Sequence, residues 1–207
     1  MKNNFDCDFQ PTAQAFIAAL PQDFDCEISV SWRKKEVAAA KSKKVKREKT
    51  FVWALLEHAV KEVFGKKIEE YSPKKDASGK ICADGIFVSV SHSGNYALVA
   101  VAKNKIGCDI EERKDKDFAR LVEKIATENE KKLFDEEKDK KTCFYKLWTA
   151  KEAAYKQSGE NVFAPDKTEV GGNNIDYFIT ENFVAAVAFD GKTQFNFLRC
   201  ENGKFFE

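Results

Sequence analysis

The middle of the chain alternates apolar runs with short polar turns, a pattern typical of consecutive β-strands. Two runs, 86–91 and 96–102, flank Gly94-Asn95, a dipeptide that favours a tight turn, and so predict a β-hairpin. A shorter run around Ile106 follows a second turn. We expect the three strands to bring four polar residues to neighbouring sheet ends, namely Ser91, His92, Asp109 and Glu111.

Apolar residues at helical spacing predict most of the remaining elements. The stripe through Phe51, Leu55 and Ala59 predicts a helix, in one or two pieces, from Trp32 to Gly65, a residue type that often ends helices. Three further helices are predicted at 118–126, just after the capping box 127–130, and at 144–157, where Ser158-Gly159 follows.

The N-terminal pattern is less regular. Apolar residues in 13–20 follow helical spacing and predict a helix that Pro21 ends, with a short strand at Phe5–Phe9 before it. Residues 25–32 alternate loosely, which leaves strand or loop open. Residues 71–84 are rich in Lys, Ser, Asp, Pro and Gly and predict a loop.

The C-terminal region predicts antiparallel strands at 183–189 and 194–198, joined by a turn at Asp190-Gly191. Helices and short strands therefore occur in both halves, and no linker separates the halves. We predict an α+β fold. A chain of 207 residues is long enough for one domain or two small ones.

Composition excludes several kinds of partner. The formal charge of +1, from 35 basic and 34 acidic residues, gives no overall field for nucleic acid or an anionic membrane surface. Six cysteines lie far apart without a Cys-x-x-Cys pair, which argues against a zinc site or a redox dithiol. No apolar run approaches the length of a membrane span, and residues 1–15 lack the apolar segment of a signal peptide. We expect a cytoplasmic protein.

Two segments carry the residues best suited to chemistry. Asp109 and Glu111 are two apart on a predicted strand and should share one face of it. Glu152 and Lys156 are four apart on a predicted helix and also share a face. Neighbouring carboxylates suit a hard cation such as Mg²⁺, which proteins often bind together with substrate phosphates. The combination predicts a phosphate-bearing substrate.

Each feature alone has an ordinary explanation. Asp-x-Glu at a strand end is common, the carboxylate–lysine pair resembles a surface ion pair, and His92 would simply bond nearby backbone. The basic run Lys41–Lys49 fits a solvated helix face, with a contact to phosphate or an acidic protein as the alternative. No Gly-x-Ser-x-Gly elbow, P-loop or Gly-x-Gly-x-x-Gly occurs, so serine hydrolase, P-loop NTPase and dinucleotide-binding functions have no support.

The joint order of three segments strongly resembles the phosphopantetheinyl transferase superfamily. Its signature runs Ser-His-Ser, Gly-x-Asp-Ile-Glu, then Trp-(Ser/Thr)-x-Lys-Glu-(Ala/Ser)-x-x-Lys, and here the segments are Ser91–Ser93, Gly107–Glu111 and Trp148–Lys156. The resemblance is dense from about Gly79 to Gly159 and thin elsewhere. The length upstream of the motifs resembles the larger monomeric type, which activates peptide synthetases such as surfactin synthetase.

The resemblance implies a role for each motif residue. Asp109, Glu111 and Glu152 would bind Mg²⁺, or Mn²⁺ in its place, together with the pyrophosphate of coenzyme A. Glu152 and Lys156 would be the catalytic residues. Contacts to coenzyme A would come from Gly79, Lys80, Ser91, His92, Lys151 and Lys156, although Lys151 is equally suited to ordering the carboxylates. The sequence departs from the family at Ile81, where proline is usual, and at Trp53-Ala54 and His58.

The resemblance also implies two similar α/β subdomains in a pseudo-twofold arrangement, with the active site in the cleft between them. The N-terminal half, 1–105, would contact the donor nucleotide and its phosphates, and the C-terminal half, 106–207, would supply the metal-binding carboxylates and the catalytic helix. Lys34, Lys35 and the run up to Lys49 would lie where the family holds the remaining phosphate of the nucleotide.

The implied reaction transfers 4'-phosphopantetheine from coenzyme A to a serine of an acyl or peptidyl carrier protein by a monomeric enzyme. The acidic carrier would bind basic and apolar residues that follow the Asp-Ile-Glu strand. Alternatively, these residues would form an ordinary amphipathic helix with Phe118 in the core. They are Lys114, Lys116, Phe118, Arg120 and Leu121. Two other functions stay open: a different Mg²⁺-dependent phosphoryl or nucleotidyl transfer enzyme, and a non-catalytic carrier-binding module of the same fold.

Overall fold

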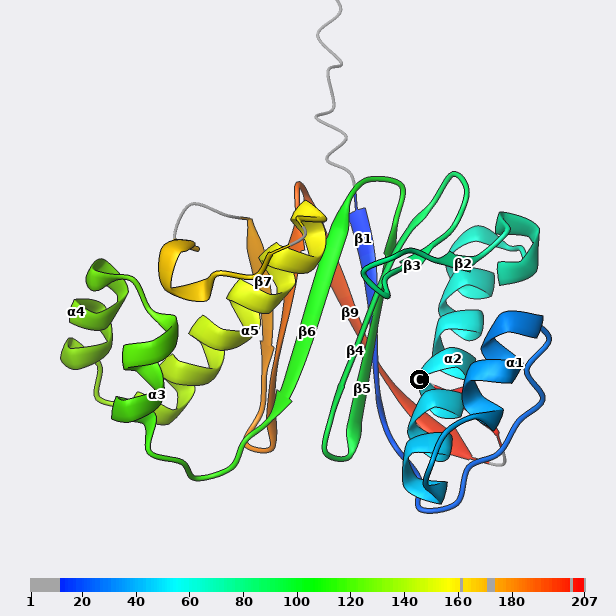
Figure 1. Ribbon diagram of the computed structural model, residues 1–207, viewed down its shortest axis with the longest axis horizontal. Helices are drawn as coiled ribbons and strands as arrows, with labels where there is room; N and C mark the ends of the chain where they lie inside the picture. The colour runs from blue at the N-terminus through cyan, green and yellow to red at the C-terminus, as the bar shows by residue number, and fades with distance from the viewer. Residues whose placement is uncertain (1–11, 161, 171–173, 202, 207) are drawn as a thin grey trace, which may run out of the picture.

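The computed structural model describes residues 12–160, 162–170, 174–201 and 203–206, so the strand predicted at Phe5–Phe9 lies outside it. The described chain forms four layers in the order helix, sheet, sheet, helix (Figure 1). The helices are α1 (Ser31–Ala38), α2 (Lys43–Phe64), α3 (Phe118–Ile125), α4 (Glu128–Glu136) and α5 (Lys140–Ser158), with 3-10 turns η1 (Ile68–Tyr71) and η2 (Pro165–Lys167). None of these helices is both long and apolar enough to cross a membrane.

The strands form two main sheets and one short hairpin. The five-stranded sheet has the order β10-β9-β1-β5-β4, the three-stranded sheet has the order β6-β8-β7, and β2 pairs with β3. Among the described strands, β1 and β9 pair in parallel and the other pairs are antiparallel. The strand bounds are β1 (Thr12–Ala19), β2 (Lys74–Lys75), β3 (Ile81–Cys82), β4 (Phe87–Ser93), β5 (Tyr96–Ala102), β6 (Ile106–Glu112), β7 (Ile175–Ile179), β8 (Phe183–Phe189), β9 (Lys192–Glu201) and β10 (Lys204–Phe206).

In the described chain, buried apolar side chains pack between each pair of neighbouring layers. Residues of β1, β5, β6 and β8 pack between the two sheets. The outer face of the five-stranded sheet packs against α2, which buries Phe51, Leu55 and Ala59 there, as their spacing predicts. Part of α3, α4 and α5 covers the outer face of the three-stranded sheet. The mixed α+β fold is therefore confirmed.

Local sequence signals correctly placed most helix ends. The helix predicted from Trp32 to Gly65 is two pieces, and Ser42 caps the second because its side chain accepts a hydrogen bond from the Val45 amide. Gly65 ends α2 with φ +70°, a conformation that glycine adopts without strain. The capping box of Thr127 and Glu130 at the start of α4 is also confirmed.

The helix predicted for 13–20 is wrong, because these residues form the central strand β1. Ala15 and Ile17 pack between the sheets, while Phe16 and Ala18 pack on the opposite side, toward α2. Both faces of the strand are buried, so its sequence lacks the apolar–polar alternation that identifies half-buried strands.

The hairpin predicted at Asp190-Gly191 is also wrong, although both strands exist. β8 pairs with β6 and β7, whereas β9 pairs with β1 and β10, so the turn passes from one sheet to the other. β9 and β10, which come from the predicted C-terminal half, join the sheet that contains β1, β4 and β5. Strand β7 was not predicted from the sequence.

Candidate active site

A cavity of about 510 Å³ lies between elements of the two halves, which is within the range of roughly 300–1,000 Å³ typical of small-molecule sites. One side comes from α1, α2 and β4, another from the β2–β3 hairpin, and the third from the C-terminal end of α5 (Figure 1). Its polar lining residues are Arg33, Glu36, Lys49, Lys75, Ser78, Lys80, Ser89, Ser91, His92, Tyr155, Lys156 and Glu160.

Serine side chains join β4 to β6 at the inner end of the cavity. Alternate residues of a strand point to one side, so Ser89, Ser91 and Ser93 all face β6. Ser91 Oγ donates to Asp109 Oδ1 at 2.7 Å, and Ser93 Oγ donates to Glu111 Oε2 at 2.9 Å. Ser89 Oγ accepts from a backbone amide of β6 at 3.0 Å. These bonds fix both carboxylates of the Asp-Ile-Glu segment beside the Ser-His-Ser strand.

Gly107 brings α5 onto the same strand. A Cβ atom at this position would lie 2.0 Å from the backbone oxygen of Ala153, so no other residue permits such a close approach of helix to strand. The approach places Lys156 Nζ 2.8 Å from Asp109 Oδ1 and 4.0 Å from Glu152 Oε2. The glycine of the Gly-x-Asp motif thus has a direct steric role in assembling the site.

The carboxylates of this cluster affect one another strongly. Burial raises the pKa of Glu152, Lys156 lowers it, and the charges of Asp109 and Glu111 raise it, with a net upward shift. Burial disfavours the charged form of Lys156, but the charge of Asp109 and its hydrogen bond, together with the negative charges of Cys108 and Glu152, outweigh burial and raise the pKa of the ammonium. Asp109 is only 4% exposed, and its Oδ2 atom has no hydrogen-bond partner among the described residues.

The opposite side of the cavity carries the reverse arrangement, three cations around one carboxylate. Glu36 accepts from Arg33 at 2.6 Å, from Lys75 at 2.6 Å and from Lys49 at 3.3 Å. Burial opposes the charge of Glu36, but the bonds from Lys75, Arg33 and Lys49 outweigh it and hold its pKa at about 2. Arg33 also lies over the Trp53 ring, 5.6 Å from the centroid.

The β2–β3 hairpin crosses from one side of the cavity to the other. Asp76 Oδ1 accepts hydrogen bonds from the Ser78 amide, the Ser78 hydroxyl and the Lys80 amide, which fixes a tight turn. Gly79 adopts φ +91° in this turn. Lys80 Nζ donates to the backbone oxygen of Lys156 at 2.6 Å and so links the hairpin to α5.

Comparison with known proteins identifies the segment that carries the carboxylates. Residues 105–189 match the family model described as the 4'-phosphopantetheinyl transferase superfamily. This part of the chain is therefore similar to that superfamily. It contains β6, α5 and the strands that pack against them, including Asp109, Glu111, Glu152 and Lys156.

Curated relatives agree with the family match. A putative 4'-phosphopantetheinyl transferase of Haemophilus influenzae is 34% identical over 76 residues, which cover 34% of this chain and 32% of the relative. The 4'-phosphopantetheinyl transferase psf-1 of Bacillus pumilus is 29% identical over 113 residues, covering 52% of this chain and 48% of the relative. The ffp protein of Bacillus subtilis is 34% identical over 79 residues, covering 37% and 35%. The aligned parts thus span a third to a half of these relatives.

Most of the residues expected from the superfamily motifs come together. Gly79, Lys80, Ser91, His92 and Lys156 line the cavity. The three carboxylates do not line it themselves; Asp109 lies directly behind Ser91 and Lys156, bonded to both. Lys34 and Lys35 are exposed and do not line the cavity, whereas Lys49, the last lysine of the basic run, does.

Lys151 is the exception among the motif residues. It is fully buried on the other side of α5, where its ammonium bonds Glu130 and two backbone oxygens of the segment 165–168. It does not line the cavity. A direct phosphate contact from Lys151, one of the two roles expected from the motif, has no support in this geometry.

The carboxylate cluster offers the kind of donor that a hard divalent cation prefers, the ion that the family resemblance implies. Its donors are oxygen atoms, one of them a buried atom without a partner, and Asp109 and Glu111 disfavour the charge of Glu152. Within the described chain, no three His, Cys, Asp or Glu side chains are close enough to hold a metal as they stand. The Lys156 ammonium compensates part of the negative charge there.

Sequence reasoning did not single out Arg33, Glu36 and Lys75. They come from α1 and β2, in segments that carry no family motif, and only the tertiary fold brings them to one cavity. Two signals were present, an Arg–Glu pair three residues apart at a predicted helix start and a lysine in the same loop as Lys80.

Proposed function

We propose that the protein transfers the 4'-phosphopantetheine group of coenzyme A to a serine hydroxyl of an acyl or peptidyl carrier protein, converting the apo to the holo form. The observation that carries this proposal is the ion pair between the buried Asp109 and the partly exposed Lys156. It joins β6 to α5 behind a cavity with a cationic opposite side, within the segment that matches the superfamily. The aligned relatives are named as 4'-phosphopantetheinyl transferases, which supports the same activity.

The cavity suits a donor with several phosphates, because cationic and hydrogen-bonding groups line more than one side of it. Lys80, Ser91, His92 and Lys156 would contact the pyrophosphate, and Gly79 would allow close approach of the hairpin backbone. The surplus positive charge around Glu36 would attract the remaining phosphate of the nucleotide.

Asp109, Glu111 and Glu152 would hold Mg²⁺, or Mn²⁺ in its place. Bound there, the ion would neutralise negative charge on the donor phosphates. The serines of β4 orient Asp109 and Glu111 for this role through their hydroxyl hydrogen bonds.

The chemical step needs positioning and charge stabilisation more than covalent help from the enzyme. The carrier serine oxygen attacks the phosphorus that bears pantetheine, the bond to the bridging oxygen breaks, and adenosine bisphosphate leaves. Glu152 accepts the serine proton, directly or through a water, because it lies next to Lys156, which lines the cavity. The Lys156 ammonium stabilises the negative charge that develops on the phosphates.

We propose further that the two helix-covered sheets are similar subdomains, and that the protein works as a cytoplasmic monomer. The carrier would meet the exposed basic residues Lys114, Lys116 and Arg120. The Phe118 ring packs against Phe144 and Tyr145, with centroids 5.4 and 5.9 Å apart, which favours a core role for that ring.

The decisive experiment is mass spectrometry of an apo carrier protein incubated with the protein, coenzyme A and Mg²⁺. We expect a mass increase of one phosphopantetheine group that disappears without coenzyme A, with a chelator, or with Glu152→Gln. Binding of coenzyme A and of apo carriers without any mass increase would indicate a non-catalytic module. Failure to bind coenzyme A, with binding of another diphosphate, would indicate a different phosphoryl or nucleotidyl transfer enzyme.

A further inference from the structure

The buried lysine of α5 uses all of its hydrogen-bonding capacity inside the C-terminal half. Lys151 has 0% exposure, and its Nζ lies 2.7 Å from Glu130 Oε2, 2.8 Å from the Pro165 oxygen, and within bonding distance of the Thr168 oxygen. An ammonium has three N–H donors, and three acceptors surround this one. No donor of Lys151 is left for a phosphate.

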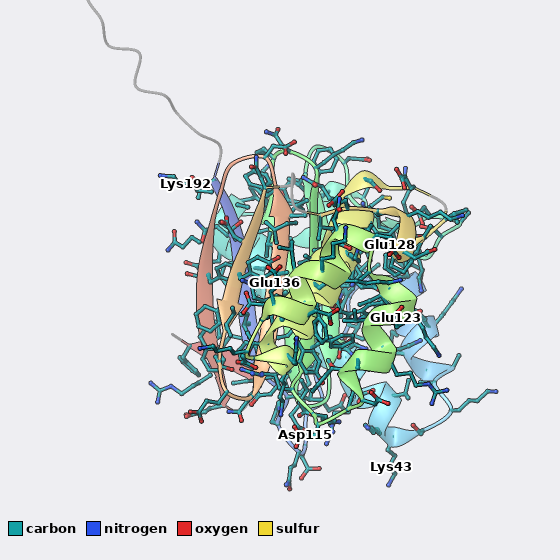
Figure 2. The ribbon with its side chains drawn as sticks, turned by 90° about the vertical axis from the view of Figure 1, so that its left-hand side faces the viewer. Lys43, Asp115, Glu123, Glu128, Glu136 and Lys192 are labelled. Atoms are coloured by element: carbon teal, nitrogen blue, oxygen red, sulfur yellow. The ribbon has the colours of Figure 1, made fainter. Side chains whose placement is uncertain are left out.

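Both carboxylate oxygens of its partner, Glu130, also accept hydrogen bonds from backbone amides. Glu130 Oε2 also accepts from the Thr127 amide at 2.8 Å, and Oε1 accepts from the Val170 amide at 3.2 Å. Figure 2 looks onto this side of the molecule, where Glu123 and Glu128 lie on the surface while Glu130 is 7% exposed. One ion pair therefore ties together α4, α5 and the segment 165–170, and we call it the Glu130–Lys151 clasp.

The clasp sits on one face of α5, next to the face that carries the active site. Trp148, Lys151 and Tyr155 follow helical spacing on the first face, where the Phe163 ring packs against Trp148 at 5.8 Å and Tyr155 at 4.9 Å. Glu152 and Lys156 lie one residue further round the helix and approach Asp109. Contacts on the first face fix the rotation of α5 about its axis. The rotation in turn determines where the side chains of Glu152 and Lys156 point.

We propose that Lys151 is a positioning residue: with Glu130 it fixes the rotation of α5 that presents Glu152 and Lys156 to the cavity, and it does not bind the donor. This inference rests on the proposed function, because the two residues that it positions are the catalytic ones of that reaction.

A double-mutant cycle tests the clasp itself. Lys151→Met and Glu130→Gln each leave a buried charge without its partner, so each should lower the thermal midpoint by about 10 °C. The double variant leaves no buried charge, and the glutamine oxygen still accepts a backbone amide. We expect the double variant to regain more than half of the decrease in thermal midpoint that each single variant shows.

Donor binding and turnover then separate the possible roles. In the double variant we expect the calorimetric Kd for coenzyme A to stay within about threefold of wild type, while kcat for transfer to an apo carrier falls roughly tenfold to a hundredfold. Lys80→Met is the matched control, because this lysine lines the cavity; it should weaken coenzyme A binding about tenfold.

Each other outcome overturns a defined part of the proposal. A coenzyme A Kd tenfold or more weaker in the double variant would make Lys151 a donor contact. A stable double variant with full kcat would reduce the clasp to a purely structural role, and additive losses of stability would exclude the clasp. A wild-type protein that neither binds coenzyme A nor transfers its arm would overturn the proposed function and the positioning role, while the stability cycle would still decide whether the clasp exists.

Discussion

The two charged clusters that flank the cavity, one on each side, are electrostatic opposites. On the side of α1, α2 and β2, three cations surround Glu36, so within the described residues this cluster has two more positive than negative charges. On the side of α5 and β6, Lys156 lies among carboxylates, with Asp109 bonded to it and Glu152 and Glu111 nearby. The first side has surplus positive charge and the second has surplus negative charge.

The comparison shows how like charges can be gathered before any ligand arrives. Each cluster contains its own counter-charge, so neither leaves a group of like charges without compensation, which would be costly in a partly buried position. Compensation is incomplete in both, so each retains an attraction for a ligand of opposite sign. A phosphate donor bound together with a divalent cation meets both demands in one cavity.

The largest expected effect comes from removing the carboxylate that defines the negative side. Asp109→Asn keeps a side-chain oxygen for Ser91 but removes the charge that pairs with Lys156. We expect transfer to an apo carrier to fall about a thousandfold, because electrostatic stabilisation at the reacting phosphates is lost.

The matched control is Glu112→Gln, at the end of the same strand, whose carboxylate pairs with the exposed Lys114. It should change transfer by less than about twofold. Transfer by Asp109→Asn within tenfold of wild type would remove Asp109 from the mechanism and break the contrast between the two sides.

The negative side could be predicted from the sequence and the positive side could not. Ser91, Asp109, Glu152 and Lys156 lie in segments whose spacing matches a family signature, and local periodicity placed them on the correct strand and helix. Arg33, Glu36 and Lys75 meet only because α1 and the β2–β3 hairpin fold against β4, which no local pattern encodes.

Burial explains two further differences between sequence and structure. β1 has apolar residues on both faces, so its pattern does not distinguish strand from helix. Lys151 belongs to the motif by its position in the sequence. In the fold it pairs with Glu130, which lies 21 positions earlier in the sequence. A motif identifies which residues matter, while burial decides which of them can reach a ligand.

A smaller effect, on coenzyme A binding, is expected on the positive side, because three cations contribute to the positive charge there. Lys75→Met removes one of them and should weaken coenzyme A binding about three- to tenfold, measured by calorimetry, with a larger effect at low salt than at high salt. Lys74→Met is the control, since the neighbouring lysine is exposed and does not line the cavity. Equal effects of the two substitutions would mean that only overall charge matters.

The smallest effect concerns stability, and it follows from the low pKa of Glu36. Its pKa is about 2 in the folded protein against an ordinary value of 4.5, because bonds from Lys75, Arg33 and Lys49 outweigh burial. A lowered folded-state pKa contributes stability that is fully present above pH 4.5 and is lost as the pH falls toward 2. Glu36→Gln should therefore lower the thermal midpoint by a few degrees near pH 7, and the difference from wild type should shrink steadily below pH 4.5. Calorimetric midpoints across this range check it. If the difference in thermal midpoint stays constant down to pH 3, the negative charge of Glu36 does not contribute to stability. The cationic cluster would then not need an internal counter-charge.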